Sequence, residues 1–254
     1  SAILSKITKA KPYLEATDSA GAIHRLWQID EKTDVERIRK ELEDKDIFIA
    51  DGHHRYETAL EFQKEMRMKR PSFLGDEPFN YVLMFLANML DSGITILPAH
   101  RLLKKVPADV KARLNEHFDI EPVSSDFDIS KKMSGKKCVF GFFQNRDHGW
   151  YLLTCKEDDL SEVNPSLRGS DVVVLHDLIL KKILSVVDVD YEMDVKKVLD
   201  KVRSGEFSAA FFLNPTGVED VEKAALSSVR MPPKSTYFYP KLLTGIVINS
   251  FLNA

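Results

Sequence analysis

Apolar and polar positions change their spacing several times in the first part of the chain, which predicts strands that alternate with helices. Residues 46–50 form a short apolar run typical of a buried strand, and apolar positions then recur at roughly helical spacing to about residue 68. A second apolar run, 79–89, predicts another buried strand that pairs with 94–97 through an Asp-Ser-Gly turn. These elements predict a first lobe that ends at about residue 105.

Beyond this lobe the pattern changes. Apolar runs at 138–143 and 150–155 flank the sequence Asn-Arg-Asp-His-Gly, which predicts a β-hairpin. Residues 171–184 carry apolar positions along one side of a helix, and a further strand is expected at 207–213.

The length of 254 residues allows a core in one large domain or in two smaller ones. The alternation before residue 105 and the mixed pattern after it favour two lobes, at 1–105 and 106–254. The predicted fold class is therefore α+β (mixed α/β). The opening residues Ser-Ala-Ile-Leu are typical neither of a natural initiator nor of a targeting segment, so we expect a truncated chain.

Composition narrows the classes of partner. The chain has 36 basic and 39 acidic side chains, a net charge of −3 and a pI of about 6.2, so no bulk attraction to nucleic acid or to an anionic membrane is expected. The longest apolar stretches fall far short of the roughly 20 residues that a membrane span needs, and no signal-peptide pattern is present. Cys138 and Cys155 lie in β-like runs, which favours reduced thiols. These features predict a soluble, cytoplasmic protein.

The stretch Asp-Gly-His-His-Arg, which follows the first apolar run, holds the densest group of titratable side chains. Amides at a helix N-terminus, the helix dipole and a guanidinium all favour a phosphate-sized anion. Gly52 and Arg55 are therefore candidate phosphate contacts, and His53 and His54 add hydrogen-bond donors. Asp51 is a candidate ligand of Mg²⁺ or a candidate proton acceptor.

Two other interpretations of this stretch stay open. His53 and His54 suggest a zinc site, but neighbouring residues of a helix point about 100° apart, and no ligand cluster is spaced to accompany them. Asp51, His53 and Arg55 would otherwise form a structural cap with a salt bridge. Neither a Gly-x-Ser-x-Gly elbow nor a Cys-x-x-Cys pair occurs, which excludes the corresponding hydrolase and redox interpretations.

A second group of candidates lies in residues 231–241, where three prolines oppose a helix or an ordinary strand. Lys234, Ser235 and Thr236 are similar to the end of a phosphate-binding P-loop, but a proline replaces the glycine which that motif requires, so we reject a Walker A motif. Lys234, Ser235, Thr236 and Lys241 stay candidate phosphate contacts from a loop of another shape. The alternative is that the lysines are solvated surface residues.

His100 and Arg101 follow another apolar run and are further candidate contacts, against the alternative of a plain surface pair. We also expect residues 231–241 to fold back against the turn at 51–55. Lys234 would then add a second positive charge, which attracts phosphate more strongly in a partly desolvated site than in water.

At residues 49–55, 97–101 and 231–241 the chain resembles the domain-of-unknown-function 1015 family of bacteria and archaea. The resemblance runs over essentially all 254 residues. Members of that family usually have a further, long N-terminal portion. The resemblance therefore implies that this chain is a fragment or a shortened relative.

The Asp-Gly-His-His-Arg stretch also resembles the Gly-x-x-Arg phosphate loop of the ParB and sulfiredoxin superfamily. That similarity implies a ParB/sulfiredoxin-like first lobe and assigns Gly52, His53, His54 and Arg55 to nucleotide phosphates. A histidine replaces the cysteine of sulfiredoxin in this chain. The resemblance therefore does not imply sulfinic-acid reductase activity.

The same superfamily includes free serine kinases. The resemblance thus implies nucleotide-dependent phosphoryl transfer to a small hydroxyl substrate, free L-serine, with ATP or ADP as the donor and with Mg²⁺. The glutamate expected to act as base belongs to the upstream portion, which leaves Asp51 as the local substitute. The alternatives are a nucleotide-binding regulatory module of ParB type without turnover, and a structural or interaction domain without a ligand.

Overall fold

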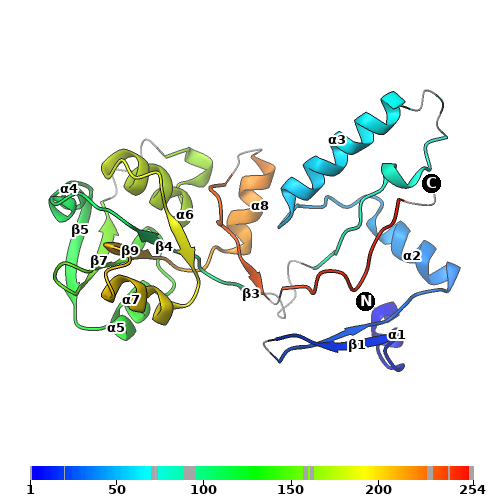
Figure 1. The fold of residues 1–254 in the computed structure, drawn as a ribbon, viewed down its shortest axis with the longest axis horizontal. Coiled ribbons are helices and arrows are strands. Elements are labelled where there is room, and N and C mark those ends of the chain that lie inside the picture. The colour runs from blue at the N-terminus through cyan, green and yellow to red at the C-terminus, as the bar shows by residue number, and fades with distance from the viewer. Residues whose placement is uncertain are drawn as a thin grey trace. The chain divides into compact units, whose positions relative to one another are not determined.

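The computed structural model describes residues 2–19, 21–69, 72, 74–88, 95–156, 160, 163–227, 231–239 and 241–251. The chain divides into two compact units (Figure 1). Unit 1 comprises Ser1–Phe85 with Lys241–Ala254, and unit 2 comprises Leu86–Pro240. Contacts thus place the division at residue 85, where the sequence pattern predicted it near 105, and they group the last residues with unit 1.

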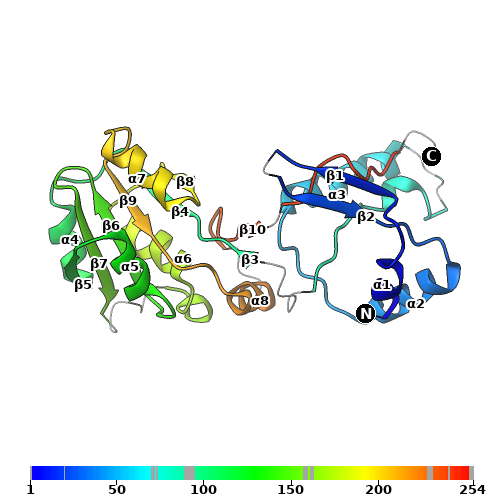
Figure 2. The ribbon, with the colours of Figure 1, turned by 90° about the horizontal axis from the view of Figure 1, so that it is seen from below.

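Unit 1 combines helices with one small hairpin. Its elements in chain order are α1 (Ala2–Ile7), β1 (Leu14–Thr17), β2 (Ile23–Leu26), α2 (Lys32–Leu42), α3 (His53–Lys69) and the 3₁₀ turn η1 (Pro78–Asn80). Strands β1 and β2 pair in antiparallel fashion and lie side by side in Figure 2. Among the described residues of this unit, the buried apolar side chains are Ile3 and Phe79. The described part of unit 1 therefore has few interior side chains.

Two strands predicted in the first lobe, at 46–50 and 79–89, are absent from the described residues of those segments. Residues 46–50 have no regular secondary structure, and Ile47 and Ile49 are 52% and 50% exposed. Residues 81–88 are likewise irregular, with Phe85 67% exposed, and the predicted turn at 91–93 lies outside the described residues. A strand needs a neighbour for its backbone N–H and C=O groups, and neither segment has one in the described sheets. The helix predicted to about residue 68 is confirmed as α3.

Unit 2 is built on a six-stranded antiparallel sheet with the order β5-β7-β6-β9-β4-β8. Its strands are β4 (His100–Leu103), β5 (Phe118–Val123), β6 (Val139–Gln144), β7 (Gly149–Cys155), β8 (Asp190–Glu192) and β9 (Ala209–Phe212). The hairpin predicted from the two apolar runs is confirmed as β6 and β7, which pair from Gln144↔Gly149. All six residues of β6 are buried, as expected for a strand covered on both faces.

Helices cover both faces of this sheet, and their bounds are α4 (Val110–His117), α5 (Asp126–Met133), α6 (Asp171–Val173), its π-helical continuation η4 (Val174–Ile183), α7 (Val195–Arg203) and α8 (Val218–Leu226). The core on one face joins η4 and α4 to side chains such as Phe142 and Phe211, and the core on the other joins α5 and α7 to Phe143 and Phe212. Figure 1 shows α6 on one side of the sheet and α5 with α7 on the other. Alternate residues of β6 and β9 therefore enter different cores.

Two shorter features complete unit 2. The 3₁₀ turn η3 (Pro165–Leu167) precedes α6, and β3 (Thr95–Ile96) pairs in antiparallel fashion with β10 (Phe238–Tyr239). Cys138 and Cys155 are free thiols, as predicted, and each is half-buried. Among the described residues, no helix combines the length and the apolar character needed to cross a bilayer.

Candidate functional site

The predicted anion turn lies where irregular backbone enters α3. Gly52 has φ of 80°, in the left-handed region that favours glycine, and α3 begins at the next residue. The side chain of Asp51 accepts a hydrogen bond from the N–H of Gly52, with an N···Oδ1 distance of 2.8 Å. The first amides of the 17-residue helix α3 therefore begin directly at the turn, where helix amides favour an anion.

The guanidinium of Arg55 folds back over Gly52. A Cβ atom built on Gly52 would lie 2.6 Å from Nη2 of Arg55 and 2.9 Å from its Cζ. Two features of this position therefore favour glycine. The φ angle is positive, and the Cβ of any other residue would displace the Arg55 guanidinium. Arg55 is exposed, so the guanidinium is open to an anion from solvent.

Asp51 is held in an ion pair with Lys241. Lys241 Nζ lies 3.1 Å from Asp51 Oδ2, within unit 1. Partial burial by itself would raise the pKa of Asp51, but the hydrogen bond and charge of Lys241, the Gly52 N–H and the charge of Arg55 outweigh it and hold the pKa below its usual value. Asp51 is therefore a stabilised carboxylate, which makes it a weaker proton acceptor.

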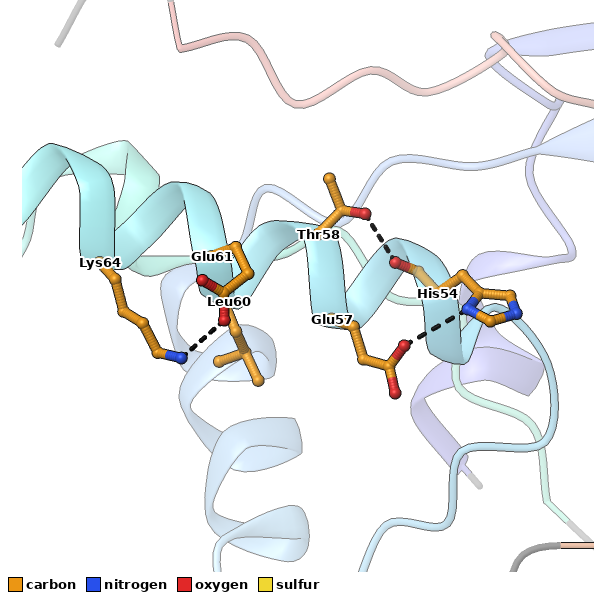
Figure 3. Close-up of a pocket in the computed structure, with 6 residues that line it drawn as sticks. All are labelled: His54, Glu57, Thr58, Leu60, Glu61 and Lys64. Carbon is orange, nitrogen blue, oxygen red and sulfur yellow. Dashed lines mark hydrogen bonds and ion pairs between the residues drawn. The ribbon is translucent and has the colours of Figure 1, made fainter.

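A hollow of about 480 Å³ lies along the same helix, and its lining residues are His54, Glu57, Thr58, Leu60, Glu61 and Lys64 (Figure 3). His54 Nδ1 lies 3.3 Å from Glu57 Oε2, and Lys64 Nζ lies 2.6 Å from Glu61 Oε1. Thr58 Oγ1 donates to the carbonyl of His54 at 2.8 Å, which fixes the first turn of the helix. The hollow thus presents one imidazole, two carboxylates and an ammonium on one helix face.

Among the described residues, His53 and His54 belong to no cluster that could hold a metal ion. Their rings contact each other at a centroid distance of 4.1 Å. In the part of the chain that the structure describes, no group of three or more His, Cys, Asp or Glu side chains is arranged to hold a metal ion. The zinc interpretation of the two histidines therefore has no support from the described geometry.

Arg101 lies in unit 2 and is fully buried on β4. Its guanidinium donates to the carbonyl of Ala99, to the carbonyl of Lys234 at 3.4 Å and to His176 Nε2 at 3.3 Å, and it lies over the ring of Tyr191. Burial lowers the pKa of Arg101 to about 10, so the group stays cationic at neutral pH. The surface-pair interpretation of this residue is wrong, because its donors serve interior groups.

His100 is also buried, at 4% exposure, and its ring contacts Phe212. Neither ring nitrogen has a hydrogen-bond partner among the described residues. Burial, with the charge of Arg101, lowers the pKa of His100 to about 4, so the ring is neutral at pH 7. That His100 and Arg101 contact a nucleotide stays a prediction.

The residues predicted in the C-terminal segment have separate surroundings. Lys234 is exposed, with φ of 56°, and its carbonyl accepts from Arg101. Ser235 is buried; its hydroxyl donates to the carbonyl of Pro232 at 2.5 Å, and its carbonyl accepts from Thr216 at 2.6 Å. Thr236 is half-buried. Their role as phosphate contacts stays a prediction, and Lys241 is the residue of this group that contacts Asp51.

Sequence reasoning did not single out His176, Tyr191 or Glu57. His176 and Tyr191 meet Arg101 only through the fold, since 75 residues separate Arg101 from His176. Glu57 could have been found, because it lies three residues after His54 in a predicted helix, and side chains at that spacing are neighbours.

Fold and site together define a mixed α+β protein with an exposed guanidinium held over a glycine turn at a helix start. The chain belongs to the family described as "Protein of unknown function (DUF1015)", whose model matches residues 1–187. The resemblance inferred from the sequence is thereby confirmed for that part of the chain.

Two kinds of solved structure are similar to this chain. A free serine kinase in complex with AMP is 12% identical, covers 60% of this chain and 56% of its own length, and has a TM-score of 0.38. A conserved hypothetical protein from Pyrococcus furiosus is 14% identical, with coverage of 60% and 59% and a TM-score of 0.39. The chain spans less than two thirds of the length of either structure. No curated protein has a matching sequence.

Proposed function

We propose that this chain takes part in nucleotide-dependent phosphoryl transfer to a small hydroxyl substrate, with free L-serine as the acceptor. One observation carries the proposal: the Arg55 guanidinium lies over Gly52 at the start of α3, so closely that a Cβ at Gly52 would come within 2.6 Å of it. A guanidinium and free helix amides converge there on one small region. That combination is suited to a phosphate group.

Phosphoryl transfer depends mainly on positioning and on neutralising charge, and the turn supplies both. Arg55 and the first amides of α3 would hold a terminal phosphate of ATP or ADP, with His53 as a further donor. Mg²⁺ in such sites is commonly bound by one or two carboxylates together with the phosphates. Asp51 would be its protein ligand, and Lys241 would neutralise further negative charge.

We further propose that the first lobe is ParB/sulfiredoxin-like, as the Gly-x-x-Arg spacing implies. A regulatory module without turnover is the second candidate function. The observation that favours it is the ion pair of Asp51 with Lys241, which lowers the pKa of Asp51 and weakens it as a base. One measurement distinguishes the kinase from the regulatory module. L-serine accelerates nucleotide consumption only if the protein is a kinase.

The binding experiment is a calorimetric titration of ATP and of ADP, the latter a nucleotide held by a solved free serine kinase. Arg55→Ala should weaken binding about 10- to 100-fold, the loss expected for a hydrogen bond to a charged group. Arg39→Ala is the matched control, since it removes a 72%-exposed arginine side chain from α2 of the same unit. Equal affinities of wild type and Arg55→Ala would overturn the assignment of the turn. Phosphoserine formation from ATP and L-serine then tests the transfer.

A further inference from the structure

Arg101 is a buried cation without a counter-charge in the described part of the chain. Its side chain is fully buried on β4, and arginine is almost never fully buried unless a partner neutralises its charge. Among the described residues no carboxylate forms an ion pair with Arg101, whereas Arg113, with a side chain that is 43% exposed, is paired with Asp109 at 2.9 Å. The interior of unit 2 thus holds a positive charge that no described side chain neutralises.

The hydrogen bonds of this guanidinium use three of its five N–H groups. Nε donates to Nε2 of His176 at 3.3 Å, Nη1 donates to the carbonyl of Ala99, and Nη2 donates to the carbonyl of Lys234 at 3.4 Å. All three acceptors are neutral, because burial and the charge of Arg101 lower the pKa of His176 to about 4. Each terminal nitrogen of Arg101 therefore keeps one N–H that donates to no described acceptor.

The surroundings of Arg101 come from separate segments of unit 2. The ring centroid of Tyr191 on β8 lies 5.2 Å from Cζ of Arg101, and this ring is nearly parallel to the imidazole of His176, with an interplanar angle of 10°. His176 belongs to the π-helix η4, and π-helical turns are rare and frequently occur at functional sites. Two strands, the π-helix and the loop at Lys234 therefore meet at one guanidinium within unit 2.

The carbonyl of Lys234 is the partner of Arg101 that a ligand could most easily replace. Its distance of 3.4 Å from Nη2 exceeds the usual range of about 2.7–3.2 Å, so this hydrogen bond is weak. Lys234 also has φ of 56°, a conformation that is unfavourable for a residue with a Cβ. The next residue, Ser235, is anchored separately, because its carbonyl accepts from the hydroxyl of Thr216 at 2.6 Å. A rotation of the backbone at Lys234 would therefore free Nη2 while Ser235 stays in place.

We propose that Arg101 is the binding site of a small carboxylate, which its two remaining N–H groups hold in bidentate fashion. A carboxylate carries one negative charge and two oxygens in a plane, so it neutralises the guanidinium and accepts from both donors. A phosphate group brings about −1.5 to −2 charges and three acceptor oxygens, and the described residues contain no second buried Lys or Arg to balance them. This site lies in unit 2 and does not depend on the proposed phosphoryl transfer.

A titration of the full chain tests the site without any substitution. Proton–nitrogen NMR follows the arginine Nε–H signals as sodium acetate, glycine or sodium phosphate is added in a constant background of sodium chloride. The Arg101 signal, assigned by its absence from Arg101→Lys, should shift with acetate and saturate in about the millimolar range, as expected of so small a ligand. The Arg113 signal is the internal control and should not shift. A shift with glycine as well indicates a site for amino acids, and a shift with acetate alone indicates a site for simple carboxylic acids.

Arg101→Lys tests the role of the planar guanidinium, because lysine keeps the charge and removes the paired donors. It should weaken acetate binding, measured by calorimetry, at least about 10-fold, and the matched variant Arg113→Lys should bind acetate as the wild type does. Acetate should also raise the midpoint of thermal unfolding of the wild type and of Arg113→Lys but not of Arg101→Lys.

The wild-type titration decides the outcome even if Arg101→Lys folds poorly. Absence of a saturable shift of the Arg101 signal with acetate and with glycine would overturn the carboxylate site. A shift with phosphate alone would overturn the choice of carboxylate and support the predicted phosphate contact instead. ATP binding at the Arg55 turn is measured separately, so its failure would leave this inference unaffected.

Discussion

Lys241 Nζ lies 3.1 Å from Asp51 Oδ2, although 190 residues separate the two in the chain. The contact connects the C-terminal segment of unit 1 to the turn that precedes α3. It also determines the chemistry of Asp51, because an ammonium at this distance stabilises the ionised carboxylate.

Removing the ammonium should therefore change the titration of Asp51. In Lys241→Met we expect the pKa of Asp51 to rise towards its ordinary range, as followed by carbon NMR of the carboxyl group. The free energy of unfolding should change by less than about 1 kcal/mol, because both side chains are substantially exposed. Lys6→Met, which removes the surface pair of Lys6 with Asp34, should leave Asp51 unaffected. An unshifted Asp51 in Lys241→Met would contradict the pairing.

Gly52→Ala should reduce both stability and anion binding. Alanine in the left-handed region costs about 1–2 kcal/mol, and its Cβ would in addition displace the Arg55 guanidinium. Gly21→Ala is the matched control, because Gly21 has φ of 84° with no atom within 4 Å of an added Cβ. Both variants should unfold more easily in denaturant, and only Gly52→Ala should lose ATP affinity. A similar affinity in the two variants would show that Arg55 does not depend on the glycine.

Asp171 of unit 2 provides a test of stability against pH. The side chain is 7% exposed, it accepts the N–H of Cys138 at 2.7 Å, and Asp220, which is paired with Lys137, lies near enough to repel it. Burial is the main reason that the pKa of Asp171 is raised to about 6 from 3.8. The folded state therefore binds a proton more readily than the unfolded state does.

The sign of the resulting effect follows from this difference. The contribution of Asp171 to the free energy of unfolding is fully present below about pH 4 and is lost as the pH rises towards 6, by about 3 kcal/mol in all. Asp171→Asn keeps an acceptor for the Cys138 N–H and should remove this dependence. Urea unfolding of both proteins between pH 4 and 7 measures the difference. Parallel curves for the two proteins would mean that Asp171 titrates normally.

His100 should act in the opposite direction. Burial and the charge of Arg101 lower its pKa to about 4 from 6.5, so its contribution is present above pH 6.5 and is lost as the pH falls towards 4. His100→Met removes the titration and the two unpartnered ring nitrogens, so it should be at least as stable as wild type at pH 7 and less sensitive to acid. Thermal unfolding at pH 7 and pH 5 measures both effects. Strong destabilisation of His100→Met at pH 7 would show that the imidazole makes a stabilising hydrogen bond in the wild type.

Much of unit 2 could be predicted because its signals are local. The apolar runs that became β6 and β7 lie on either side of a short turn, and the helix at Asp171–Ile183 shows its apolar side within four turns. The start of α3 was likewise predictable, because a glycine and polar residues precede a helical pattern. The two apolar runs predicted as strands in the first lobe carried equally strong local signals, yet their described residues form no strand, because no neighbouring strand pairs with them in the described sheets.

By itself, the sequence determined the α+β class, the helix that starts at His53 and the grouping of Gly52 with Arg55, because backbone preferences and spacings of three or four residues act within one turn of chain. Only the tertiary structure decided the partners of the remaining charges. Lys241 reaches Asp51, and Arg101 reaches His176 and the carbonyl of Lys234, through contacts between distant segments. The physical reason is that a charge takes whichever partner the folded chain brings within a few ångströms, and sequence distance does not limit that choice.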